Sequence, residues 1–201
     1  METIYVVILF VLYVALWAIK RKQQIKATGL DPEVLAGAQS AVQRYFFQLT
    51  RILTVCIIIL IFFHGIDFQF YSMFSRFPPL DDALFDHIGL ATGVTGLTVC
   101  FMAQRHMKNS WRVGIDEKNH ADLVETGMYR IIRNPTYLGL YLLCAGTWLI
   151  WPTWTIALFS IIFYLALEMQ VRCEEDFLLK THGDEYREYL KRTKRYIPRI
   201  Y

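Results

Sequence analysis

Two stretches of the sequence hold residues whose types and spacing suit chemistry, and the first runs from Gly127 to Gly139 as GMYRIIRNPTYLG. Asn134-Pro135 predicts a helix start, because proline at the first helical turn leaves no additional N–H group unpaired. The free backbone amides of such a start favour a carboxylate or the polar edge of a cofactor. Tyr129 and Tyr137 add flat apolar faces that each carry a hydroxyl group. This stretch predicts a ligand-binding turn; a basic anchor at a membrane interface is the structural alternative.

The second stretch contains Glu168, Arg172 and Glu175. Spacings of four and seven residues place all three on one face of a helix. Glu168 falls at the end of an apolar segment, where an ionisable group is a functional-site candidate. The structural alternative is a self-neutralising ion pair between Glu168 and Arg172 at the membrane surface.

The elements that must position these residues are apolar helices, since hydrophobic residues make up 55% of the 201 residues and aromatic residues 15%. This exceeds the usual composition of a soluble domain. Five apolar segments stand out: Ile4–Ile19, Leu49–Phe63, Ile88–Met102, Leu138–Ile150 and Thr155–Leu167. Several are shorter than the roughly 20 residues that cross a bilayer, but aromatic flanks extend them into the interface. The sequence predicts an all-α integral membrane protein with about five transmembrane helices; a soluble helical bundle is the alternative.

The basic residues are sorted between alternate connections. Six Lys and Arg lie between Lys20 and Arg51, six between Arg105 and Arg133, and eight from Arg172 onward, whereas the other two connections hold only Arg76. The positive-inside rule then places the N-terminus outside and the C-terminal face in the cytosol. The membrane would be the plasma membrane in a bacterium and the endoplasmic reticulum in a eukaryote. A net charge of +3 is too small to indicate nucleic acid, and the basic loops suit anionic lipid headgroups.

The chain divides into two parts. Residues 1–104 are predicted to form three spans with an interfacial segment over 27–48. Residues 105–201 are predicted to form the catalytic half: a cytosolic loop, a tight transmembrane hairpin over 137–171, and a C-terminal cytosolic helix ended by Pro198. Gly89 and Gly93 form a GxxxG motif, which permits close helix packing and is compatible with an oligomer.

Several function classes lack support in the sequence. The five histidines and four cysteines show no metal-ligand spacing. GxSxG, P-loop and Rossmann patterns do not occur. Hydrolysis, phosphoryl transfer, soluble-type dehydrogenase chemistry and a metal site are therefore not predicted.

From Trp111 to Pro198 the sequence resembles the isoprenylcysteine carboxyl methyltransferase family, whose relatives include the phospholipid N-methyltransferases. The resemblance lies in LVETGMYRIIRNPTYLG, the apolar hairpin that follows, and EEDFLLKTHGDEYREYLKRTKRYIP. It implies an integral membrane enzyme that takes S-adenosylmethionine from the cytosol and a lipophilic or lipid-modified acceptor from the bilayer. A prenylcysteine-type carboxylate is one such acceptor; a phospholipid amine or a thiol is the alternative.

The resemblance also implies which residues bind and react. The implied cofactor pocket is made of Ala121, Asp122, Leu123, Val124, Tyr129, Asn134, Pro135, Thr136, Tyr137 and Glu174. Glu174 is expected to anchor the cofactor, while Arg133 and Arg172 orient the acceptor or the cofactor carboxylate. Glu168 is expected to accept a proton if the acceptor is an amine or a thiol.

Two positions depart from the family pattern. Asn134 stands where the family usually has histidine, so a proton-handling role there is lost. Gln170 stands where the prenylcysteine enzymes place an arginine for the substrate carboxylate. Both departures argue against a prenylcysteine carboxylate as the acceptor.

Two rival functions remain open. Sterol reductases that use NADPH have a similar turn, but they continue Tyr-x-Gly-Glu, and Leu140 occupies the glutamate position here. A non-enzymatic membrane scaffold would use the polar stretches as interface anchors only.

Overall fold

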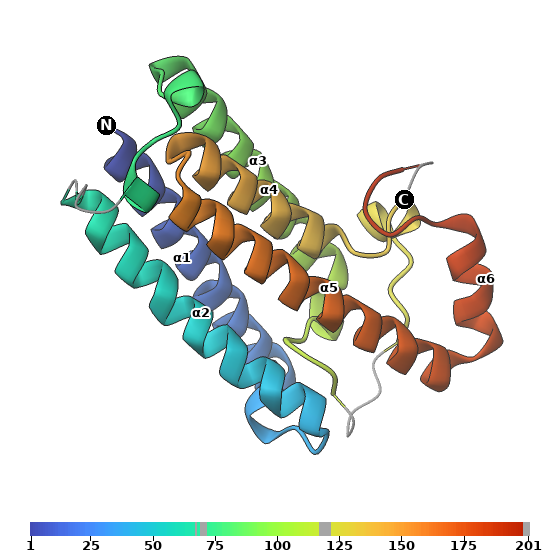
Figure 1. Cartoon of the computed structure of the whole chain (residues 1–201). Coiled ribbons are helices and arrows are strands. Elements are labelled where there is room, and N and C mark those ends of the chain that lie inside the picture. Colours follow the sequence, from blue (N-terminus) through green and yellow to red (C-terminus); the bar gives the residue numbers. More distant parts are fainter. Residues whose placement is uncertain (67, 69–71, 117–121, 199–201) are drawn as a thin grey trace.

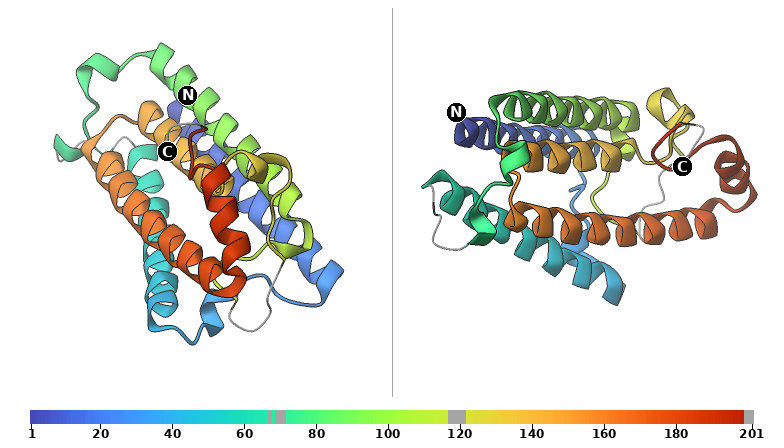
Figure 2. Two further views of the ribbon diagram at one scale, coloured as in Figure 1. Left: turned by 90° about the vertical axis from the view of Figure 1, so that its right-hand side faces the viewer. Right: turned by 45° about the horizontal axis from the view of Figure 1, so that its top comes forward.

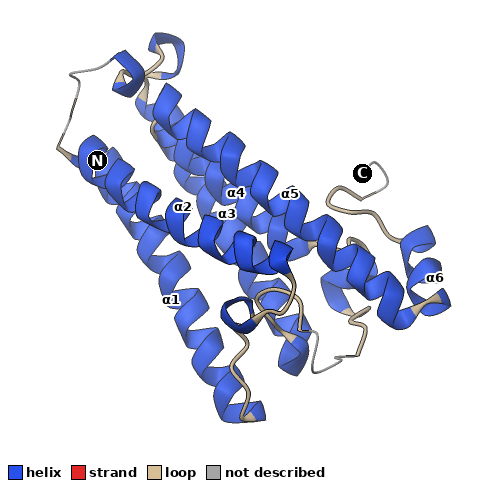
Figure 3. Cartoon of the chain, turned by 60° about the horizontal axis from the view of Figure 1, so that its bottom comes forward, coloured by secondary structure: helices blue, strands red, loops and turns tan. Residues whose placement is uncertain are grey.

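The computed structural model describes residues 1–66, 68, 72–116 and 122–198, and these residues form helices and loops with no β-strand (Figure 3). The α-helices are α1 Glu2–Thr28, α2 Ala41–Gly65, α3 Ala83–Met107, α4 Pro135–Ile150, α5 Trp154–His182 and α6 Asp184–Arg192. The short 3-10 helices are η1 Leu35–Gly37, η2 Ser72–Phe74, η3 Pro78–Leu80, η4 Lys108–Ser110 and η5 Gly127–Arg130.

Four of these helices are long and apolar enough to cross a membrane, namely α1, α2, α3 together with η4, and α5. The fifth apolar helix, α4, has only 16 residues. At about 1.5 Å per residue it rises about 24 Å, less than the roughly 30 Å of a hydrocarbon core. The expected multi-pass helical protein is therefore confirmed, but only four of the five expected spans reach the required length.

The helices pack in two groups that share one bundle (Figure 2). Helices α1, α3 and α4 lie together, and α2 lies beside α5. One apolar core joins α1, α3, α4 and the start of α5 through Val6, Leu9, Leu97, Ile150, Trp151 and Ile156. A second core joins η1, α2 and α5 through Leu35, Phe46, Leu53, Ala166 and Leu167. The outer faces carry exposed apolar side chains such as Ile4, Val11, Ile52, Val55 and Leu165, as lipid-facing surfaces do.

Glycines bring α3 and α4 into backbone contact. A Cβ atom added to Gly146 would lie 2.5 Å from the carbonyl oxygen of Gly89 and 2.6 Å from the nitrogen of Gly93. A Cβ atom added to Gly96 would lie 2.5 Å from the carbonyl oxygen of Gly139. Small residues allow this approach, which gains dispersion contacts between helices in lipid. The close packing predicted for the GxxxG motif thus occurs within the chain, between α3 and α4.

Replacing Gly146 with alanine is expected to destabilise the bundle by about 3 kcal/mol or more. The new methyl group meets backbone atoms of α3, which cannot rotate away as a side chain can, so the helices must separate. Thermal unfolding of the purified protein in detergent measures the loss. Gly37→Ala is the matched control, because nothing lies within 4 Å of its added Cβ. Equal melting temperatures for both variants would contradict the packing.

The helix boundaries differ from the sequence-based expectation at three places. Helix α2 begins at Ala41, so residues 41–48 belong to this helix and not to a separate surface segment. Helix α5 continues past residue 171 to His182, where Gly183 ends it with a φ of 54°. Helix α6 ends at Arg192, six residues before Pro198, because the backbone of residues 194 and 195 pairs with another segment, described below.

Candidate active site

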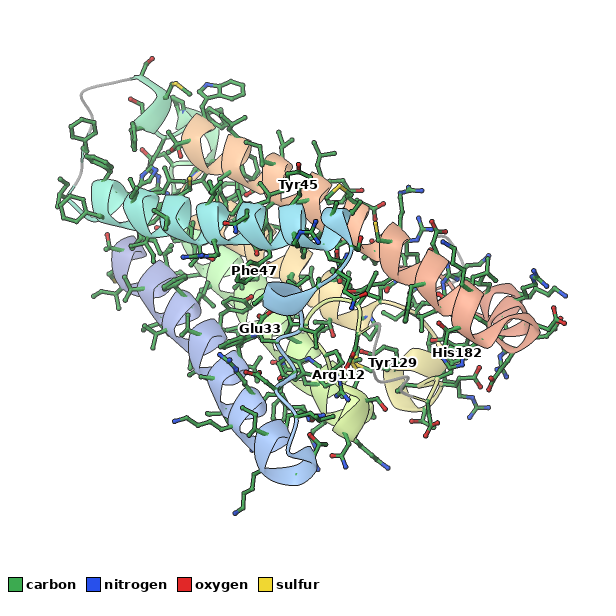
Figure 4. The ribbon with its side chains drawn as sticks, turned by 90° about the horizontal axis from the view of Figure 1, so that it is seen from below. Glu33, Tyr45, Phe47, Arg112, Tyr129 and His182 are labelled. Carbon is green, nitrogen blue, oxygen red and sulfur yellow. The ribbon has the colours of Figure 1, made fainter. Side chains whose placement is uncertain are left out.

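The candidate site lies at the end of the bundle where α4 begins, α5 extends outward and α6 folds back (Figure 1). Polar side chains gather at this end in Figure 4, which labels Tyr129 and Arg112. Helix α4 begins at Pro135, as the sequence predicts, with Asn134 as its N-cap residue. The Asn134 side chain makes no capping hydrogen bond, so the amides of this helix start are not capped by it.

Glu174 lies against the first turn of α4. Its Oε1 atom accepts a hydrogen bond of 2.8 Å from the Tyr137 hydroxyl and one of 3.0 Å from Nε2 of Gln170. Both donors are neutral, and within the described part of the chain no Lys, Arg or His forms an ion pair with this carboxylate. Glu174 is therefore a part-buried acid without a counter-charge.

A pair of buried glutamines supports Glu174 from behind. Nε2 of Gln43 donates to Oε1 of Gln170 at 2.9 Å, and Nε2 of Gln170 donates to Oε1 of Gln43 at 3.2 Å. Oε1 of Gln43 also accepts the backbone N–H of Ile115 at 3.1 Å. Both side chains are 1% exposed. Burying two amides is costly unless they are paired, so this pair ties α2 and the loop after α3 to Glu174.

Glu175 is the centre of an ion cluster that holds the C-terminal tail, residues 193–198, against the turn before α4. Its Oε1 atom accepts from Nε of Arg133 at 3.1 Å, from Nδ2 of Asn134 at 3.2 Å and from Nε of Arg195 at 3.2 Å. Its Oε2 atom binds a terminal nitrogen of Arg195 at 2.6 Å. Arg133 also donates to the carbonyl oxygen of Thr193 at 2.7 Å. In the structure Arg133 therefore helps to hold the C-terminal tail in place. A direct role of Arg133 toward the cofactor or the acceptor stays a prediction.

The backbone completes this attachment. The N–H of Arg133 donates to the carbonyl of Lys194 at 2.8 Å, and the N–H of Asn134 donates to the carbonyl of Arg195 at 3.1 Å. The tail therefore runs alongside the turn before α4, which explains why α6 stops early.

Tyr129 closes one side of the site from η5. Its side chain is buried, its hydroxyl lies 3.5 Å from Oγ1 of Thr136, and its carbonyl accepts the Tyr189 hydroxyl at 2.7 Å. Burial raises the pKa of Tyr129 far above its ordinary value, so the hydroxyl stays neutral. Helix α6 thus holds η5 in place, and η5 presents Tyr129 to the start of α4.

Glu168 and Arg172 form an ion pair at 3.2 Å, which is the structural alternative given above for this stretch of the sequence. Sequence reasoning did not anticipate the second partner of Glu168, the hydroxyl of Tyr196 on the tail. The Tyr196 hydroxyl also lies 3.2 Å from the Tyr141 hydroxyl. Glu175, placed by the helix period on the same face as Glu168 and Arg172, binds Arg133 and Arg195.

The structure brings most of the predicted site residues together. Glu174, Tyr137, Thr136 and Tyr129 form one connected set at the start of α4, with Pro135 fully buried beneath them. Asp122 is exposed, while Leu123 and Val124 are part-buried in the segment that precedes η5. Ala121 lies outside the described residues. Among the described side chains, no group of three or more His, Cys, Asp or Glu residues is placed to hold a metal ion.

Sequence reasoning missed Gln43, Tyr141 and Tyr196 in this region. The sequence did not single out Gln43, because Gln48 in the same polar start of α2 is also a glutamine and is exposed. Nothing in a single sequence indicated that Tyr196 returns to α5.

Replacing Gly127 with alanine is expected to displace η5. This residue has a φ of 61°, and an added Cβ would overlap the ring of His106 on α3. We expect a loss of about 1–3 kcal/mol beyond the strain of a left-handed alanine. Gly29→Ala is the control, because Gly29 has a φ of 72° and open space around its Cβ. Thermal unfolding in detergent compares the two, and His106→Ala should restore part of the loss only in the Gly127→Ala background.

Comparison with known proteins relates the chain to membrane methyltransferases. Residues 85–185, half of the chain, match the phospholipid methyltransferase family. Protein-S-isoprenylcysteine O-methyltransferase of Schizosaccharomyces pombe is 31% identical over 84 residues, which cover 41% of this chain and 35% of that relative. A probable protein-S-isoprenylcysteine O-methyltransferase of Oryza sativa subsp. indica is 27% identical over 129 residues, which cover 62% of this chain and 67% of that relative. The chain belongs to the phospholipid methyltransferase family, with isoprenylcysteine methyltransferases among its relatives.

Proposed function

We propose that this protein is an integral membrane methyltransferase that uses S-adenosylmethionine and acts on a lipophilic acceptor held in the bilayer. One observation carries the proposal: Glu174 is a part-buried carboxylate that accepts two neutral hydrogen bonds and forms no ion pair within the described residues. A carboxylate taken out of water without a counter-charge favours a cationic ligand.

The residues at the start of α4 fit S-adenosylmethionine. Glu174 would complement its ammonium group, which S-adenosylhomocysteine shares. The helix start at Asn134-Pro135, which the Asn134 side chain does not cap, favours a carboxylate. Tyr129 and Tyr137 supply aromatic surface beside these groups, and Asp122–Val124 would complete the pocket. A molecule of S-adenosylmethionine held by these residues would supply an electrophilic methyl group for the acceptor atom, and its sulfur would keep the electron pair of the bond that breaks.

The acceptor class decides whether a base is needed. A carboxylate acceptor loses no proton, so the site would have only to orient it and exclude water. An amine or thiol acceptor must lose one proton, and Glu168 is the residue we assign to receive it. One feature favours the amine or thiol. A carboxylate acceptor would need a cation to bind it, but Arg133 and Arg195, two arginines beside the start of α4, are bound to Glu175.

The proposal includes an orientation. Residues 105–201 would form the catalytic half facing the cytosol, with the N-terminus outside and residues 1–104 supplying three spans. The charge distribution supports this arrangement, because the candidate site lies at the end of the bundle where α1 and α3 end (Figure 1), and the basic residues of 20–26 and 105–112 lie at those helix ends.

Calorimetric titration of the detergent-purified protein with S-adenosylhomocysteine, and separately with NADPH, tests the function. Binding of S-adenosylhomocysteine alone supports methyl transfer, and binding of NADPH alone would support the sterol-type reductase instead. Binding of neither to folded protein would favour a scaffold. Transfer of radioactive methyl from S-adenosylmethionine to N-acetyl-S-farnesylcysteine or to phosphatidylethanolamine then distinguishes a carboxylate from an amine acceptor.

A further inference from the structure

A tyrosine from the C-terminal tail lies among the polar groups between α4 and α5. After α6, the backbone of Lys194 and Arg195 pairs with the turn before α4, and Tyr196 follows as a buried residue that is 5% exposed. Its ring packs edge-on against that of Tyr141 on α4, with centroids 5.2 Å apart. The tail therefore inserts a side chain into the bundle.

The Tyr196 hydroxyl fixes the Glu168 carboxylate. It donates to Oε1 of Glu168, while Arg172 binds Oε2 from a side chain that is 60% exposed. Burial and the hydrogen bond to Glu168 raise the pKa of Tyr196, so the hydroxyl keeps its proton and remains a donor. Of the two partners, only Tyr196 is buried beside the carboxylate.

The linked side chains of Glu168, Tyr196 and Tyr141 lie next to the hydrogen-bonded pair of Glu174 and Tyr137. Tyr137, which binds Glu174, and Tyr141, which contacts Tyr196, are four residues apart on α4 and so face the same way. Glu168 is therefore about one helical turn from the proposed cofactor site. A buried carboxylate and hydroxyl inside an apolar bundle cost free energy that leucine and phenylalanine would not, so stability alone does not account for them.

We propose that Tyr196 is a positioning residue for methyl transfer, which orients Glu168 on the acceptor side of the site and makes the docked tail part of the active site. This inference rests on the proposed function, and it adds a residue outside the segment matched to the family. Tyr196 acts through Glu168 and is not expected to contact the cofactor.

A double-mutant cycle tests this role. Methyl transfer to phosphatidylethanolamine, whose amine must lose a proton, is measured with saturating S-adenosylmethionine. Tyr196→Phe keeps the ring and removes the hydroxyl, and we expect a kcat/KM for the acceptor at least tenfold lower. Glu168→Gln should cause a similar loss, and the double variant should be no more than about twofold worse than either single variant, because both changes remove one function.

Controls separate positioning from folding. Tyr164→Phe alters another tyrosine whose ring contacts Tyr141, at 4.9 Å, but which is exposed; it should keep kcat/KM within about twofold. The affinity of Tyr196→Phe for S-adenosylhomocysteine should also stay within about twofold of wild type. Three results would each overturn the role of Tyr196 alone. The first is unchanged methyl transfer by Tyr196→Phe, and the second is a double variant whose loss of kcat/KM equals the product of the two single losses. The third is a Tyr196→Phe variant whose affinity for S-adenosylhomocysteine falls as much as its kcat/KM. No transfer to phosphatidylethanolamine by a wild-type protein that binds S-adenosylhomocysteine would likewise overturn the role of Tyr196 alone. A wild-type protein that does not bind S-adenosylhomocysteine would overturn the proposed function, and this inference with it.

Discussion

Glu174→Gln is expected to lower the affinity for S-adenosylhomocysteine on the order of 100-fold while leaving the protein folded. Glutamine keeps an oxygen that can accept from Tyr137 and Gln170, so the neutral hydrogen bonds survive and only the charge is lost. Removing one partner of a buried charge pair typically costs about 2–5 kcal/mol of binding free energy. Isothermal titration with S-adenosylhomocysteine gives the affinity, and a thermal melt gives the fold.

Asp176→Asn provides the matched control, since it removes the same charge two residues away on an exposed part of α5. Its affinity should remain within about twofold of wild type. Normal affinity in Glu174→Gln would remove Glu174 from the cofactor site. An equal drop in both variants would mean that net charge, and not a contact, governs binding.

Glu175→Ala is expected to destabilise the protein by about 3–5 kcal/mol and to release the tail. The side chain of Glu175 is 12% exposed, and its removal leaves Arg133 and Arg195 without their shared counter-charge. Hydrogen exchange should rise at Arg133 and Asn134, whose N–H groups donate to the tail. Methyl transfer should fall as well, because Tyr196 would no longer be held at Glu168.

Glu188→Ala is the control for this change. Glu188 pairs with Lys191 at 2.6 Å, but both side chains are about two-thirds exposed or more. Exposed pairs contribute about 0–1 kcal/mol, so this variant should melt close to wild type and exchange normally at Arg133. If Glu175→Ala behaved like Glu188→Ala, the ion cluster would not be what holds the tail.

Local rules predicted a large part of the fold. Apolar segments located the spanning helices, Asn134-Pro135 marked the start of α4, and four-residue spacing placed Glu168 and Arg172 on one face of α5. Each signal depends on neighbouring residues, so one sequence suffices to find it.

The contacts that were missed join residues far apart in the sequence. Gln43 and Gln170 are 127 positions apart, and Glu168 and Tyr196 are joined across α6. Helix periodicity says which residues share a face but not which face meets which, so neither pair could be found without the three-dimensional arrangement. The early end of α6 could not be predicted for the same reason. It depends on backbone pairing of the following residues with residues 131–134, and not on the sequence of the helix itself.

The attachment of the tail to the turn before α4 also fixes the order in which the site can be completed during synthesis. Thr193 follows Arg133 by 60 residues, and the hairpin of α4 and α5 must be made before it. At about 5–20 residues per second a ribosome needs roughly 3–12 s for that length. Arg133 exists throughout this interval and Glu175 is added 42 residues after it, but Arg195 and Tyr196 are made only after the interval ends. The tail contacts that complete the candidate site can therefore form only after α4 and α5 have been synthesised.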